Sequence, residues 1–204
     1  MTFLFRFGAA SGLLAGVAIG IPGTIEAFTG KTTPTSFVLG LSPFVALPLL
    51  VALHLSQARV AGRLGAAGYA VALVGTGMFG AAAYTLDIAL IHFDRPVVTH
   101  LLRGPTGTAV LASALVFIAG CVLFGLSMVR AGVYPRLPAW GYAVVLPVFA
   151  LSAPLPYSPY KGILHVLAAA VLIWLSLALA RQPGAVSSRE LSSPPASFPA
   201  GAAR

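Results

Sequence analysis

The chain has 204 residues, of which 58% are hydrophobic and only 8% are charged, and its mean hydropathy is +0.96. A soluble domain is about 45–50% apolar and roughly 25% charged, so this composition excludes an ordinary water-soluble fold and a disordered chain. A disulfide-stabilised scaffold is also excluded, because the single cysteine, Cys121, has no partner within the chain.

Six apolar runs follow one another along the chain, and a helix of this length rises far enough to cross a hydrocarbon core of about 30 Å, although the fifth run is short. The runs cover residues 7–28, 36–56, 66–91, 106–129, 139–155 and 162–180. We therefore expect an all-α polytopic membrane protein, a bundle of six transmembrane helices in one domain over 1–181. In a five-span alternative, 139–155 does not cross. Residues 182–204, rich in Pro, Ser and Ala, predict a disordered cytoplasmic tail.

Basic residues are unequally divided between the two sides that six spans create. One side, with both termini, holds Arg6, Arg59, Arg63, Arg130, Arg136, Arg181, Arg189 and Arg204, and the other holds Lys31, Arg95, Arg103 and Lys161. The positive-inside rule then predicts cytoplasmic N- and C-termini in a plasma (inner) membrane. The net charge of +8 is explained by topology, so we expect the lipid bilayer as partner and no nucleic acid.

An internal repeat relates residues 63–74 to residues 136–147, where eight of the twelve positions are identical at an offset of 73. The same offset pairs Phe44 with Phe117 and Leu50 with Leu123. Spans two and three would then repeat in parallel as spans four and five, an arrangement that some transporters use. Chance similarity between Ala/Leu/Val-rich helices is the alternative.

Small residues form a stripe along the first span, where Gly8, Gly12, Gly16 and Gly20 recur every four residues. Such a stripe lets another backbone approach closely. The second backbone belongs either to a helix of the same chain or to another copy in a homo-oligomer.

Residues 94–105 predict a short amphipathic helix in the plane of the membrane surface. Asp94 suits the N-cap, Pro96 the first turn, and Gly104-Pro105 a stop. The apolar positions are Val97, Val98, Leu101 and Leu102, and the other face holds Arg95, Thr99 and Arg103. The helix either rests on the membrane or acts as a lid over an outer cavity.

A set of ionisable residues is expected near the outer face, judged from depth at 1.5 Å per helical residue. This candidate outer polar cluster consists of Glu26, Asp87, His92, Asp94, His100 and His165. Its members contact headgroups and water, or form a site for a proton, cation or solute, or include two histidines that bind haem or a metal. No recognised ligand motif distinguishes these interpretations. The leading expectation is that the protein binds no cofactor.

Catalytic motifs are absent from the sequence, which has no His-Glu-x-x-His, no Gly-x-Ser-x-Gly and no phosphate-binding loop. We therefore assign no catalytic residue and favour a protein that is not an enzyme. His54 stands alone near the cytoplasmic end of the second span, and Cys121 is expected to be a buried thiol.

The segment from Val129 to Trp140, followed by a short Pro-containing span and a final helix ending in Arg181, resembles multi-pass membrane proteins of high-GC bacteria, actinobacteria among them. The resemblance covers about residues 129–181 and implies a bacterial plasma-membrane protein, but it carries no functional motif. The leading functional expectation is a structural, sensory or accessory role. The alternatives are a small-solute, ion or proton transporter using the outer polar cluster, and a haem-binding redox component.

Overall fold

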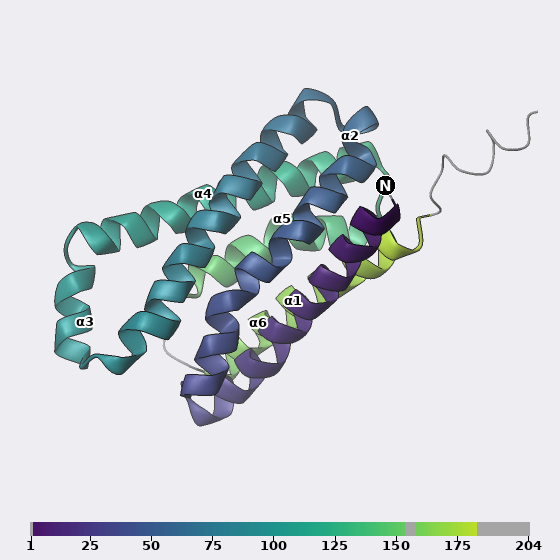
Figure 1. The fold of residues 1–204 in the computed structure, drawn as a ribbon. Helices are drawn as coiled ribbons and strands as arrows, with labels where there is room; N and C mark the ends of the chain where they lie inside the picture. Colours follow the sequence, from purple (N-terminus) through teal and green to yellow (C-terminus); the bar gives the residue numbers. More distant parts are fainter. Residues whose placement is uncertain (1, 154–157, 183–204) are drawn as a thin grey trace, which may run out of the picture.

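The computed structural model describes residues 2–153 and 158–182, and the elements within these ranges are all helical. They are α1 (Thr2–Thr29), α2 (Thr33–Tyr84), the π-helix η1 (Thr85–Ala89), the 3-10 helix η2 (Leu90–His92), α3 (Arg95–Leu102), α4 (Pro105–Ala131), α5 (Arg136–Leu151) and α6 (Pro159–Ala180). Figure 1 shows them as a bundle with α3 set at one end. The predicted tail, apart from Gln182, lies outside the described residues.

Four helical segments are long and apolar enough to cross a membrane, which supports a multi-pass membrane protein. They are Phe3–Thr29, Thr33–His92, Pro105–Ala131 and Pro159–Ala180. The fifth predicted run, 139–155, lies in α5 only as far as Leu151; α5 has 16 residues, and residues 154–155 lie outside the described ranges.

Gly62 divides α2 into two segments. Its φ of 57° and ψ of −155° lie outside the helical region, in a conformation that glycine adopts readily. The chain turns back here, so the two segments lie beside each other (Figure 1), and Gly80 of the second approaches Phe44 of the first. The break expected over residues 57–65 is thus confined to one residue, because helix continues to Ala61 and resumes at Arg63.

Helix ends follow local sequence signals. Proline stands in the first turn of α2, α3, α4 and α6, where its missing N–H costs no hydrogen bond. Asp94 is the N-cap of α3 as predicted, although its side chain makes no capping bond. Prolines inside spans do not end them: helix continues through Pro22, Pro43, Pro48 and Pro147.

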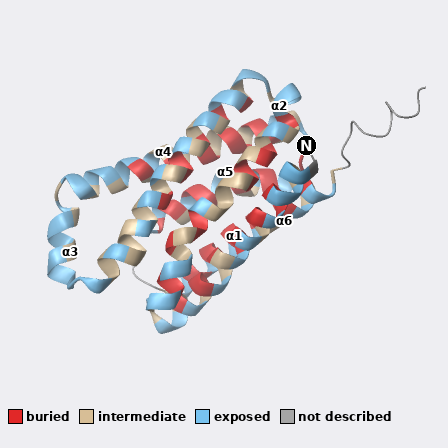
Figure 2. Cartoon of the chain, viewed as in Figure 1, coloured by how far each residue is buried: buried red, intermediate tan, exposed pale blue. Residues whose placement is uncertain are grey.

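The core lies where neighbouring helices meet. α1 packs between α2 and α6, α2 packs against α4, and α5 packs against both α4 and α6. Figure 2 shows buried residues between the helices and exposed ones on the outer surface. Large apolar side chains such as Leu14, Leu111 and Ile163 are exposed there, as expected of a surface that lipid covers.

The glycine stripe on α1 is occupied by helices of the same chain. Gly8 lies against α2 at Pro48 and Ala52, whereas Gly16 and Gly20 lie against α6 at Ala169. Gly12 contacts both neighbours, through Leu49 and Ser176. The intrachain alternative therefore explains these small residues, and a homo-oligomer stays a prediction.

The repeated segments occupy similar positions. Arg63 resumes the helix after Gly62, and Arg136 begins α5. Tyr69 and Tyr142, which the repeat equates, both place their rings against Phe124 of α4, at centroid distances of 6.3 and 5.9 Å. This correspondence is compatible with a duplication and does not test it.

Candidate functional site

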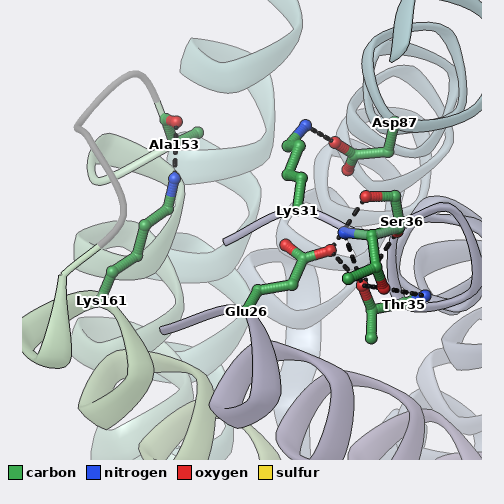
Figure 3. Close-up of polar contacts among 8 residues, drawn as sticks. Glu26, Lys31, Thr35, Ser36, Asp87, Ala153 and Lys161 are labelled. Atoms are coloured by element: carbon green, nitrogen blue, oxygen red, sulfur yellow. Dashed lines mark hydrogen bonds and ion pairs between the residues drawn. The ribbon is translucent and has the colours of Figure 1, made fainter. Parts of the chain in front are cut away.

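Glu26 is the most deeply buried acidic residue among those described, with an exposed fraction of 0%. It lies in the last turn of α1, and its Oε1 accepts hydrogen bonds from Thr35 Oγ1 at 2.6 Å and Ser36 Oγ at 2.9 Å (Figure 3). Its Oε2 is buried and has no hydrogen-bond partner within residues 2–153 and 158–182. One half of this carboxylate is therefore bound and the other half is left without a donor.

A tight turn between α1 and α2 brings the two hydroxyl groups to Glu26. Gly30 has a φ of 75°, a left-handed conformation that favours glycine, and its N–H donates to the Glu26 carbonyl at 3.0 Å. Thr32 then caps α2, forming a capping box with Thr35. This local geometry places the Thr35 and Ser36 hydroxyl groups, in the first turn of α2, beside Glu26 in the last turn of α1.

An ion pair between Lys31 and Asp87 joins the same turn to η1, which directly follows α2 (Figure 3). Asp87 lies in η1, where the chain widens into a π-helix, a local feature often found at functional sites. Both side chains are partly exposed, at 32% and 21%. Solvent screens such a pair, so it adds at most about 1 kcal/mol to stability.

The first turns of α6 add a second cation and an imidazole. Lys161 Nζ donates to the Ala153 carbonyl at 3.0 Å, and His165 Nδ1 bonds to the Lys161 carbonyl at 2.7 Å. The His165 ring also meets the Phe149 ring edge-on at 4.9 Å. Lys161 and His165 both lie within electrostatic range of Glu26 and Asp87.

Gly23 admits the His165 ring into the contact between α1 and α6. A Cβ atom at this position would lie only 2.1 and 2.2 Å from two ring atoms of His165, and 2.5 Å from its Cβ. The position of the His165 ring therefore requires glycine at residue 23, one helical turn before Glu26. The close packing of α1 and α6 thus lies directly beside the polar group.

The structure divides the predicted outer polar cluster. Glu26, Asp87 and His165 belong to one group, which we call the Glu26 site and which also contains Lys31, Thr35, Ser36 and Lys161. The other three, His92, Asp94 and His100, lie in η2 and at α3, are exposed, and make no polar side-chain contact with the Glu26 site within residues 2–153 and 158–182.

Depth along each helix explains why sequence reasoning grouped all six residues. Counting residues gives the level of a side chain across the membrane but not its position around the bundle. The same reasoning missed Lys31 and Lys161, which it used only as indicators of topology, and it missed Thr35 and Ser36. The signal available for these residues was their closeness in sequence to Glu26 and His165.

A second polar group lies at the other end of the first α2 segment, near Gly62. His54 stacks on Tyr69, with ring centroids 4.1 Å apart, and its Nδ1 is buried without a hydrogen-bond partner among the described residues. Gln57, fully buried, reaches Ser127 Oγ at 3.5 Å through Nε2, and its Oε1 is likewise without a partner. His54 is thus less isolated than the sequence suggested.

Tyr134 lies near this second polar group, in the turn between α4 and α5. Its hydroxyl bonds to the Ser56 hydroxyl, and its side chain is buried. Burial raises the pKa of the Tyr134 phenol to about 12, and the bond from Ser56 opposes part of that rise.

The Glu26 site offers two carboxylates, two ammonium groups and one imidazole, so its charges are nearly balanced. Oxygen and imidazole groups of this kind can bind a proton or a small cation. Within residues 2–153 and 158–182, no group of three His, Cys, Asp or Glu side chains could hold a metal ion. In the comparisons with known proteins, no family model, curated protein or solved structure matches the chain.

Proposed function

We propose that the protein is a small carrier that binds a proton or a small cation at the Glu26 site and passes it across the membrane. The observation that supports this function is the fully buried Glu26, whose Oε2 lacks a partner in the described part of the chain. Removing a carboxylate from water costs several kcal/mol, and the two hydroxyl bonds offset only part of that cost. A donor or cation that binds Oε2 would offset the rest of this desolvation cost.

This observation favours transport over the structural, sensory or accessory role. A carboxylate that only contacts headgroups would be exposed at the interface, whereas Glu26 lies between α1, α2 and α6. The unpartnered polar atoms of His54 and Gln57 give a second polar group towards the opposite end of the bundle. A carrier needs such groups near both faces.

The proposed topology has six crossings, formed by α1, the two segments of α2, α4, α5 and α6. The reversal of the chain at Gly62 supports the separate second and third crossings. The excess of arginine on one side favours cytoplasmic termini, and the resemblance of residues 129–181 favours a bacterial plasma membrane. α5, at about 24 Å of helix, would require a locally thin hydrocarbon layer.

Reconstitution into liposomes tests the proposal. Vesicles loaded with a pH-sensitive dye report proton entry when valinomycin and a potassium gradient impose an inside-negative potential, and parallel vesicles without that gradient receive Na⁺, K⁺ or ammonium. We expect the parent protein to cause acidification reported by the dye, or uptake of one of the three cations, and we expect Glu26→Gln, which keeps the side-chain volume and one acceptor oxygen, to abolish it.

Asp94→Asn is the matched control, since it removes one negative charge from an exposed residue outside the Glu26 site. It should transport like the parent. The proposal is refuted if neither protons nor any of the three cations enter faster than in empty vesicles, or if Glu26→Gln is as active as Asp94→Asn.

A further inference from the structure

Helix α3 lies at one end of the bundle and has exposed residues on two sides. It packs against α4 but contains no buried residue. Val98 and Leu102 are half-buried, whereas Val97 and Leu101, on the same apolar side, remain 45% and 39% exposed. Figure 1 shows the helix at the far end of the molecule. Part of its apolar side is thus open to the surroundings.

The opposite face of α3 is basic. A shallow, open hollow of about 510 Å³ lies over this face, bordered by Arg95, Pro96, Thr99, His100 and Arg103. Arg95 and Arg103 lie eight residues apart, about 12 Å along the helix and nearly on one face. The Thr99 hydroxyl already donates to the Arg95 carbonyl at 2.8 Å, so the two guanidinium groups are the main donors. None of the lining residues is acidic.

We propose that α3 binds the headgroup of an anionic phospholipid. Its exposed apolar residues enter the upper acyl-chain region, while Arg95 and Arg103 extend from the basic face to the lipid phosphate. Guanidinium groups are suited to phosphate because they present several donors in a fixed plane. The exposed apolar side of the same helix favours a lipid as the source of that phosphate, because a nucleic acid or a free ion would leave Val97 and Leu101 in water.

Lipid contact at α3 can be measured with one fluorescent label. Cys121 is buried, so Phe93→Cys, at an exposed position just before α3, would introduce the one exposed thiol of the described residues and accept a small fluorophore. The labelled full-length protein is placed in phosphatidylcholine vesicles that contain a fixed share of brominated phosphatidylglycerol or, in the parallel sample, brominated phosphatidylcholine. Stronger quenching by the phosphatidylglycerol reports its enrichment beside α3.

Each arginine near an anionic surface contributes about 1 kcal/mol, which corresponds to roughly fivefold in local enrichment. We therefore expect at least about fivefold selectivity for phosphatidylglycerol in the labelled parent. Arg95→Gln with Arg103→Gln should abolish it. The matched control, Arg59→Gln with Arg63→Gln, removes the same charge from exposed positions near Gly62 and should retain the selectivity.

Three results would overturn the proposal: equal quenching by both lipids, an equal loss of selectivity in the control pair, or full displacement of phosphatidylglycerol by dilute inorganic phosphate. The last result would assign the basic face of α3 to a free anion. Because the label reads lipid composition and not transport, failure of this proposal is independent of the carrier function. Gel filtration of each variant confirms that it is folded.

Discussion

Replacing Gly23 by alanine tests whether α1 and α6 meet as closely beside the Glu26 site as the structure indicates. The added Cβ would lie 2.1 Å from His165 Cδ2 and 2.2 Å from Cγ, whereas ordinary contacts begin near 3.4 Å. The ring must therefore shift by about 1 Å, which disturbs the hydrogen bond between its Nδ1 and the Lys161 carbonyl.

The expected loss of stability follows from these contacts. Overpacking costs about 1–3 kcal/mol and the weakened hydrogen bond about 1 kcal/mol. The higher helix propensity of alanine relative to glycine offsets up to about 1 kcal/mol of this loss. The net loss is about 1–3 kcal/mol, which corresponds to roughly 2–12 °C in melting temperature for a chain of this size.

Thermal unfolding in detergent, followed by tryptophan fluorescence, provides the assay. Gly77→Ala is the matched control, because no heavy atom lies within 4 Å of the Cβ that it would add. Its melting temperature should equal or exceed that of the parent. In addition, Gly23→Ala combined with His165→Ala should cost less than the sum of the two single changes, because the ring that clashes is gone. The reasoning fails if Gly23→Ala melts like Gly77→Ala, or if the double variant shows a purely additive loss.

Three further changes test other contacts. Gly12→Leu should lower the yield of folded monomer on gel filtration, since even a Cβ there would lie 2.2 Å from the nearest side-chain atom; an unchanged elution and melting temperature would contradict the tight packing of α1. Lys31→Gln and Asp87→Asn should each cost at most about 1 kcal/mol in thermal unfolding and together little more than either alone, because the pair is partly exposed and shared; fully additive losses would argue against the ion pair. For Tyr134, a folded pKa of about 12 against an ordinary value of 10.0 means that its contribution is complete below pH 10 and is lost as pH rises towards 12. Melting temperatures measured between pH 8 and pH 12 should therefore fall more steeply for the parent than for Tyr134→Phe, and equal slopes would contradict this assignment.

The sequence by itself determined the helical membrane class, because 58% hydrophobic content and long apolar runs leave no other way to satisfy the backbone in lipid. It also located some helix ends to within one residue, although the starts of α1, α2, α5 and α6 lie three to five residues before the predicted ones. Proline in a first turn and glycine at a reversal act through the backbone of the residue itself, so the starts of α3 and α4 were predictable locally. The single-residue break at Gly62 was not, since a glycine with positive φ and a glycine inside a helix have the same sequence signature.

Only the tertiary structure decided which polar residues meet. Counting along the helices predicts one level for Glu26, Asp87, His165, His92 and His100, but the order in which helices pack around the bundle determines their lateral neighbours. That order depends on many weak contacts between apolar faces, among them the approach of α6 to Gly16 and Gly23. Residue spacing along one helix contains no information about these contacts, because each is made with a helix distant in sequence.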